Sequence, residues 1–267
     1  MALVIVICIL VFIALAILLW ACIEPSMLKV TNTVINSNSK CNLRILYFSD
    51  LHAEYCYIPV ETVIQAIEDN VPDIVIFGGD ICNKPAKCSK GVAYLKAIAD
   101  YCKSSGIPFI GTTGNHDVEI NSSSIAECGF NNINSGMYLL TDKNSRQILF
   151  TGLYDSGRNN RVWQTIPENI PSEFDYHICL SHNPDQIKHL GDIKPNLMIS
   201  GHIHGGQIRT PIKLEFIIRK DDLPRKGIIS GLHHVDGVDL FISKGIGCVG
   251  LPFRLGVKPE INIIDIK

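Results

Sequence analysis

The sequence predicts an α/β fold in which two packed mixed β-sheets are flanked by helices, preceded by one N-terminal transmembrane helix. Three observations predict this architecture. Residues 2–23 contain no charged side chain. From residue 43 onward, short β-rich runs alternate with helical patterns, as in βαβ units around a buried sheet. The second half of the chain is richer in strand patterns, so we expect a second sheet that packs on the first.

The apolar segment 2–23 predicts an uncleaved membrane anchor. As a helix it would span roughly 33 Å at about 1.5 Å per residue, close to the roughly 30 Å hydrocarbon core of a bilayer. A cleaved signal peptide is the alternative, but this run is longer than an ordinary signal-peptide core and no Lys or Arg precedes it. Residues 19–22, Leu-Trp-Ala-Cys, loosely resemble a lipoprotein processing site, but the bulky Trp20 fits that pattern poorly. The nearest basic residues, Lys29, Lys40 and Arg44, all follow the segment, which favours a cytoplasmic location for the rest of the chain.

The remaining elements follow from local patterns. A polar stretch rich in Asn and Ser at 32–42 predicts a linker, so we divide the chain into an anchor (1–23), a linker (24–42) and one domain (43–267). Runs of β-branched and aromatic residues predict strands, and apolar residues at helical spacing predict helices. In the first half we expect strands at 43–48, 74–77 and 108–112 and helices at 59–69 and 92–104. In the second half we expect a helix at 185–190 and strands at 137–140, 147–151, 177–181, 197–200, 238–243 and 260–266.

Composition argues against two classes of function. The formal net charge is -2 and no long cluster of Lys and Arg is present, so a nucleic-acid partner is not expected. The ten cysteines include no Cys-x-x-Cys pair, and their spacing therefore gives no support to a zinc-ribbon site. We expect unpaired, mostly buried thiols.

Metal-competent side chains follow five of the predicted strands. Because the carboxyl ends of strands form the usual ligand crevice of α/β sheets, these side chains are expected to converge. Residues two apart in an extended chain point the same way, so each Asp-x-His or His-x-His pair can bind metal from one wall. The candidates are Asp50 and His52, Asp80, Asn115 and His116, His182, and His202 and His204.

Each motif alone has an ordinary structural explanation. An Asp that follows a strand is usually a turn former or a helix cap. A single His next to Asn or Asp is weaker still, and His189, His233 and His234 are interpreted as surface or loop residues. The ordered set of five clusters, all at strand ends, is what favours a metal site.

These clusters resemble the motif series of the calcineurin-like metallophosphoesterase superfamily over most of the domain. The matching residues are Asp50-Leu51-His52, Gly79-Asp80, Gly114-Asn115-His116-Asp117, His182 and Gly201-His202-Ile203-His204. The resemblance implies a four-layer αββα sandwich. Residues 181–185, 201–207, 243–245, 251–254 and 259–260 are similar to the membrane-associated bacterial branch. That branch includes enzymes similar to UDP-2,3-diacylglucosamine pyrophosphatases and cell-envelope phosphoesterases.

The resemblance implies a role for each residue. Asp50, His52 and His204 would bind one divalent ion, Asn115, His182 and His202 the other, and Asp80 would bridge them. His116 would stabilise the phosphoryl oxygens or protonate the leaving group. The implied reaction is attack of a metal-bound hydroxide on a phosphomonoester, phosphodiester or pyrophosphate, on a lipid-linked or nucleotide-linked substrate at the membrane. Imidazoles with Asp and Asn oxygens favour Mn, Fe or Zn over Ca or Mg.

Other functions stay open at this point. A metal-binding membrane protein without turnover and an acyl or amide hydrolase would both use these ligands. Ile81-Cys82-Asn83-Lys84 replaces the Asp-Arg-Gly continuation found in protein phosphatases of the superfamily, so phosphoprotein substrates are not expected. Asp117 stands where many relatives have Glu and is not assigned as a ligand.

Overall fold

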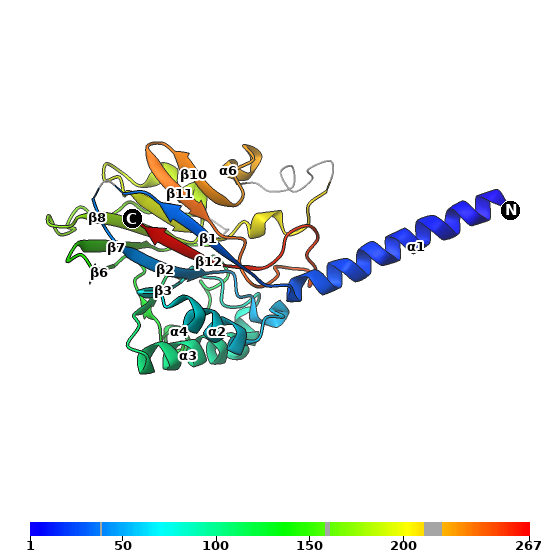
Figure 1. The fold of residues 1–267 in the computed structure, drawn as a ribbon, viewed down its shortest axis with the longest axis horizontal. Helices are drawn as coiled ribbons and strands as arrows, with labels where there is room; N and C mark the ends of the chain where they lie inside the picture. The colour runs from blue at the N-terminus through cyan, green and yellow to red at the C-terminus, as the bar shows by residue number, and fades with distance from the viewer. Residues whose placement is uncertain (38, 158–160, 211–220) are drawn as a thin grey trace.

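Two six-stranded β-sheets form the centre of the fold (Figure 1). The computed structural model describes residues 1–37, 39–157, 161–210 and 221–267. The first sheet has the order β1 (Lys29–Ile35), β12 (Glu260–Ile266), β2 (Leu43–Phe48), β3 (Ile74–Phe77), β4 (Phe109–Gly111) and β5 (Asn131–Asn132). The second has the order β10 (Gly231–Val235), β11 (Val238–Ile242), β9 (Leu197–Ser200), β8 (Tyr176–Ser181), β7 (Gln147–Leu153) and β6 (Met137–Thr141). Both sheets mix parallel and antiparallel pairs, which confirms the predicted fold class.

The helices lie outside the two sheets. The first sheet is covered by α2 (Val60–Asn70), α3 (Ser89–Ser104) and the short α4 (Ser122–Glu127) (Figure 1). Among the residues that the structure describes, the outer face of the second sheet carries two short elements, η4 (Pro184–His189) and α6 (Asp222–Arg225). The segment 185–190, for which we expected a helix, is mostly the 3-10 helix η4.

Alternating side chains of one strand supply two separate cores. From β2, Ile45 and Tyr47 pack between the sheets, whereas Leu46 and Phe48 pack under the helices. Successive residues of a strand point to opposite faces, so a strand covered on both faces is apolar throughout. This explains why the buried strands of this chain are continuous runs of Ile, Val, Leu and Phe.

The structure corrects the predicted linker. Lys29–Ile35 lie within the residues that we assigned to a linker, but they form β1, which pairs in parallel with β12 from Lys29–Glu260 to Ile35–Ile266. The side-chain amide of Asn262 also donates a hydrogen bond to Thr31 Oγ1 at 2.8 Å. Because β1 is an edge strand with mostly exposed side chains, it has polar residues that resemble a linker. Little chain therefore separates α1 from the sheet.

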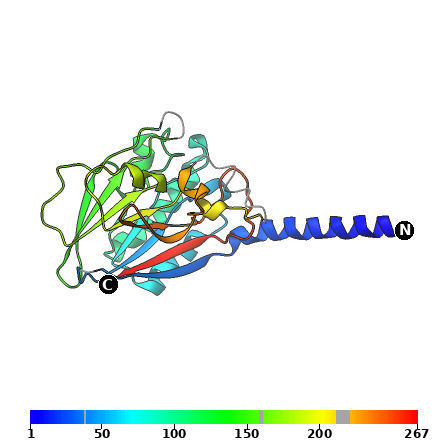
Figure 2. The same ribbon diagram turned by 90° about the horizontal axis from the view of Figure 1, so that it is seen from above.

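The N-terminal helix α1 (Ala2–Ile23) projects away from the sheets (Figures 1 and 2). It is long and apolar enough to cross a membrane, although a signal sequence would have the same properties. The cysteines confirm the expectation of free thiols, because Cys8 and Cys22 are exposed on or next to this helix and the other eight are buried.

We expect acid to destabilise the fold because His177, at the beginning of β8, is buried. Burial lowers its pKa from 6.5 to about 4, and its Nε2 lies 2.9 Å from Thr151 Oγ1. The unfolded chain therefore binds more protons between these two pH values. The free energy of unfolding falls as the pH decreases through that window, by about 3 kcal/mol in total.

Urea unfolding of the chain and of a His177→Gln variant, measured across that pH window, tests this expectation. Gln can keep a hydrogen bond to Thr151 but does not titrate, so the variant should show the flatter pH dependence. Equal pH dependence of the two chains would rule out His177 as the source.

Candidate metal centre

The predicted metal-binding residues follow the carboxyl ends of strands from both sheets. Asp50 and His52 follow β2, Asp80 follows β3, and Asn115 and His116 follow β4 in the first sheet. His182 follows β8, and His202 and His204 follow β9, in the second sheet. In each sheet these strands are parallel neighbours, so their carboxyl ends share one edge.

Strained backbone marks this edge. Five of the seven predicted metal ligands have a φ between 38° and 70°, a left-handed conformation that is unusual for residues other than Gly. They are Asp50, His52, Asp80, His202 and His204. Such strain costs of order 1–3 kcal/mol per residue and is concentrated at functional sites. At these five positions the strained backbone turns the side chains of the predicted ligands toward one another.

One group of side chains consists of Asp50, His52 and His204, all fully buried. The Nε2 atoms of His52 and His204 lie 3.2 Å apart, and His204 Nε2 lies 3.2 Å from Asp50 Oδ1. Two ligands at right angles around one ion, each roughly 2.1 Å from it, lie about 3 Å apart. Among the described residues, Nδ1 of either imidazole has no hydrogen-bond partner. The spacing fits a single cation.

The second group consists of Asp80, His182 and His202. The Nδ1–H of His182 donates to the carbonyl oxygen of Gly78 at 2.7 Å, because a carbonyl can only accept. The other ring nitrogen, Nε2, lies 3.1 Å from Asp80 Oδ2 and would offer its lone pair to a metal ion that displaces its proton. This is the arrangement by which a metal-binding His is usually oriented.

Asp80 lies between the two groups. Its Oδ2 is 3.1 Å from His182 Nε2 and 3.4 Å from His52 Nε2, one imidazole from each group. Its Oδ1 accepts a hydrogen bond from the backbone N–H of His116 at 2.9 Å. Nearby, the buried Oδ1 of Asn115 has no hydrogen-bond partner in the described part of the chain. This oxygen is available as a further ligand.

The buried carboxylates of the site carry negative charge that a bound cation would balance. Burial alone would raise the pKa of Asp50 and of Asp80, but the surrounding imidazoles lower both below their ordinary value. Burial opposes a proton on His182, yet the charges of Asp80 and Asp50 raise its pKa to about 10. Burial lowers the pKa of His204 to about 3. Two buried carboxylates therefore need positive charge beside them, which a divalent ion would supply.

Asp117, which the sequence left without a role, connects two loops of the site. Its carboxylate accepts hydrogen bonds of 2.8 Å from the backbone N–H groups of Asp80, Ile81 and Gly114. Burial raises the pKa of Asp117 to about 7. Gly114 packs so closely that a Cβ there would collide with the Asp80 carboxylate. These contacts hold Asp80 in place and explain an acidic residue that is not itself in either group.

His116 lies at the border of two hollows. Its Nδ1–H donates to the carbonyl of Asn83 at 3.1 Å, and its ring packs edge-on against His52 with centroids 5.0 Å apart. The residues around it line hollows of about 460 Å³ and 400 Å³. The larger contains Glu54, Tyr55, Asn83, Lys84, Lys87, His116, Val249 and Gly250. His116 is thus placed where a substrate would meet the metal-binding residues.

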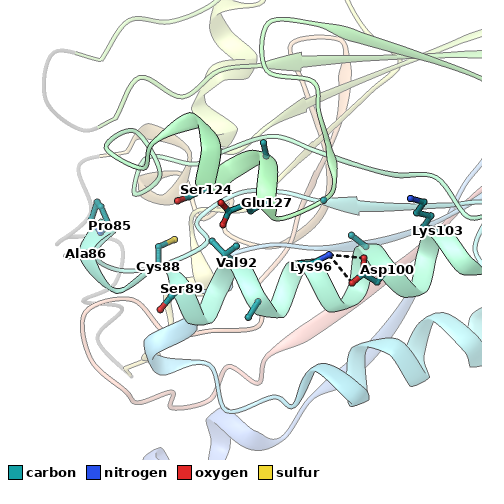
Figure 3. Close-up of a pocket in the computed structure, with 14 residues that line it drawn as sticks. Pro85, Ala86, Cys88, Ser89, Val92, Lys96, Asp100, Lys103, Ser124 and Glu127 are labelled. Atoms are coloured by element: carbon teal, nitrogen blue, oxygen red, sulfur yellow. Dashed lines mark hydrogen bonds and ion pairs between the residues drawn. The ribbon is translucent and has the colours of Figure 1, made fainter.

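Another hollow, of about 850 Å³, lies along α3 and α4 on the outer face (Figure 3). Its lining includes Cys88, Ser124 and Glu127, and the ion pair Lys96–Asp100 crosses its wall. None of the predicted metal ligands lines it. Size alone does not identify the functional site here; the converging ligands do.

Sequence reasoning missed two charged residues near the centre. Asp221 Oδ1 lies 3.6 Å from His202 Nε2 and 3.6 Å from a guanidinium nitrogen of Arg161. Neither residue lies in a segment for which the sequence gave a helix or strand pattern, so no periodic signal pointed to them. Tyr154–Gly157 border hollows near the site. His233 and His234, which we interpreted as surface or loop residues, lie on the strand β10.

Comparison with known proteins agrees with this geometry. Residues 43–206 match the family described as calcineurin-like phosphoesterase. The chain is 28% identical over 234 residues to the metallophosphoesterase YkoQ of Bacillus subtilis, covering 84% of this chain and 83% of that one. It is 25% identical over 236 residues to the phosphodiesterase YaeI of Escherichia coli, covering 84% and 82%.

A third relative carries a more specific name. The chain is 26% identical over 245 residues to the UDP-2,3-diacylglucosamine pyrophosphatase LpxG of Chlamydia trachomatis, covering 71% of this chain and 73% of that one. The family match includes more than half of the chain and every one of the eight predicted site residues. The chain belongs to the calcineurin-like phosphoesterase family, and this membership supports hydrolysis of phosphate esters with divalent metal ions.

Proposed function

We propose that this chain hydrolyses a phosphomonoester, phosphodiester or pyrophosphate with two divalent ions held side by side. The observation that carries the proposal is the position of Asp80, whose Oδ2 faces His52 on one side and His182 on the other. A carboxylate at that position can serve two cations at once. Pairs of metal ions about 3.5–4 Å apart are typical of phosphatases.

In this proposal Asp50, His52 and His204 hold one ion, and Asn115, His182 and His202 hold the other. Nitrogen and oxygen donors together favour Mn, Fe or Zn. When bound, the ions would polarise a phosphoryl oxygen and lower the pKa of a water molecule that attacks phosphorus. The protein groups position these ligands: the Gly78 carbonyl fixes the ring of His182, and Asp117 fixes the Asp80 loop.

His116 is proposed as the group that meets the leaving oxygen. Its hydrogen bond to the Asn83 carbonyl fixes the ring at the border of the two hollows. From there the imidazole can stabilise the phosphoryl oxygens or give a proton to the leaving group. Lys84 and Lys87, which line the same hollow, add positive charge for an anionic substrate.

A lipid-linked or nucleotide-linked substrate is the finer part of the proposal. It is supported by α1, which has the length and composition of a membrane anchor, and by the similarity to a pyrophosphatase named for a diacylated UDP-sugar. We propose a single-pass membrane location, with the basic residues after α1 favouring the cytoplasmic side.

Metal removal tests the proposal. The full-length chain in detergent is treated with a chelator and then reloaded with Mn, and bis(p-nitrophenyl) phosphate and p-nitrophenyl phosphate are offered as substrates. We expect two ions per chain and turnover only in the reloaded protein. A His52→Ala variant should lose metal and turnover, whereas His234→Ala should keep both, because the His234 side chain is 68% exposed and pairs with Asp239.

Metal loading without turnover would be the contradicting result. A folded, metal-loaded chain that released no product from these esters or from UDP-linked lipids would contradict the hydrolase proposal. It would instead favour a metal site without turnover.

A further inference from the structure

The metal centre lies at the end of the fold from which α1 emerges. The first strand, β1, begins at Lys29, shortly after α1 ends at Ile23, and it runs away from that helix. Because β12 is parallel to β1 and β2 is antiparallel to β12, β2 runs back toward α1. Its carboxyl end, which carries Asp50 and His52, therefore lies on the α1 side (Figure 1).

The end of α1 is attached to the folded domain. The backbone N–H of Arg254 donates to the carbonyl of Ala21 at 3.1 Å, within the last turn of the helix. The backbone N–H of Gly256 donates to Glu24 Oε2 at 2.7 Å, and the Glu24 side chain is buried. Two contacts on either side of the helix end fix its position relative to the loop that contains Arg254.

That loop is apolar and exposed. Residues 249–253 read Val-Gly-Leu-Pro-Phe, and the Leu251 residue is 56% exposed while Pro252 and Phe253 are partly exposed. Trp20, next to Ala21 in α1, is 46% exposed, and Trp side chains are enriched at the boundary between lipid and water. The hydrogen bond between Ala21 and Arg254 therefore sets the loop at about the depth of that boundary. Exposed apolar side chains at this depth have lipid as their natural partner.

The same loop reaches the metal centre. Val249 and Gly250 line the hollow beside His116. The guanidinium of Arg254 donates to the carbonyls of Lys244, Gly245 and Gly247, and the N–H of Gly247 donates to the Asp50 carbonyl at 2.8 Å. One continuous segment thus connects Asp50, the hollow and the end of α1.

From this arrangement we infer that residues 249–253 form a second membrane contact, an interfacial loop whose partner is the surface of a lipid bilayer. With α1 it holds the hollow beside His116 against the headgroup layer, so that phosphate groups of membrane lipids reach the site without leaving the bilayer. The statement about substrate rests on the proposed hydrolysis. The membrane contact itself does not.

Fluorescence quenching by brominated lipids tests the contact directly. In a full-length chain carrying Trp20→Phe and Trp163→Phe, a single Trp is introduced as Leu251→Trp, or as Leu139→Trp for the matched control. Leu139 is 47% exposed and lies on β6. This strand forms one edge of the second sheet, and β10 forms the opposite edge. Each protein is reconstituted in phosphatidylcholine vesicles with and without bromine on the acyl chains.

We expect the emission of Trp at position 251 to shift to shorter wavelength and to fall about twofold in brominated vesicles, since an interfacial side chain lies near the acyl boundary. The control should change in neither respect. Equal emission of the two variants in both vesicles would overturn the interfacial loop, whether or not the chain hydrolyses phosphate esters.

Kinetics then separate this inference from the proposed function. Leu251→Asp should lower kcat/KM for a phospholipid substrate in vesicles about tenfold relative to its kcat/KM for bis(p-nitrophenyl) phosphate, because a charge in the loop disfavours insertion. Leu139→Asp should leave this ratio unchanged. If no ester is hydrolysed by any variant while quenching at position 251 persists, the proposed function fails and the membrane contact stands.

Discussion

An Asp80→Asn variant is expected to lose about a thousandfold in kcat/KM for bis(p-nitrophenyl) phosphate, the upper range for a single electrostatic contact in an active site. The substitution keeps the shape of the side chain but removes its charge. The oxygen that now faces both His52 and His182 would become part of a neutral amide, which is a poor ligand for two cations. We expect the ion content to fall below two per chain as well.

The matched control is Asp100→Asn. Asp100 pairs with Lys96 on the outer face of α3, and its side chain is 63% exposed (Figure 3). Its removal should leave turnover and metal content unchanged, because an exposed pair contributes little. Circular dichroism of the original chain and of both variants checks that each protein is folded. Activity of Asp80→Asn close to that of the original chain would contradict a role for this carboxylate at the centre.

Replacement of Arg254 by Met is expected to have the largest effect on stability, lowering the free energy of unfolding by about 3–5 kcal/mol. Arg254 is fully buried, and its guanidinium donates hydrogen bonds to four backbone carbonyls, those of Lys244, Gly245, Gly247 and Val257. Met fills a similar volume but donates none of these bonds. The Gly245 carbonyl would still accept from the N–H of Glu260 at 3.1 Å, but the carbonyls of Lys244, Gly247 and Val257 would lose this donor, at a cost of about 1–3 kcal/mol each if nothing relaxes.

Urea unfolding of the full chain in detergent measures this effect. Arg146→Met is the control, because Arg146 pairs with Asp175 at the surface and its side chain is 42% exposed; a change below about 1 kcal/mol is expected there. Arg254→Lys should lie between the two, since one ammonium group cannot reach all of the carbonyls. Equal stability of the Arg254→Met and Arg146→Met variants would show that the buried guanidinium does not organise this loop.

The buried strands could be predicted from the sequence because they carry two faces of apolar residues. For β2, β3, β9 and β12 the predicted bounds agree with the structure. The edge strand β1 could not be recognised, because its stability comes from pairing with β12 and not from its own apolar residues. The helix α3 begins at Ser89, before its apolar pattern starts at Val92, because the N–H of Val92 donates to the carbonyl of Cys88 at 2.9 Å and so places residues 89–91 in the first turn.

For the site, sequence motifs predicted which residues converge, and the structure brings the Asp and His side chains into two groups. Their division between two ions stays a prediction. The roles of Asp117 and Arg254 could not be predicted, because both act on backbone groups from distant segments. Only the folded chain shows which N–H and C=O groups those side chains meet.

The pairing of β1 with β12 has a consequence for biosynthesis. The strand next to α1 is among the first parts of the domain to leave the ribosome, but its partner β12 is formed by Glu260–Ile266, which follow the other described strands. Until β12 has been synthesised, β1 has no strand to pair with and β2 lacks the strand that covers its edge. Synthesis of β12 is thus the event that closes the first sheet beside α1. A chain that lacked β12 would leave two open strand edges, those of β1 and β2, where other chains could pair.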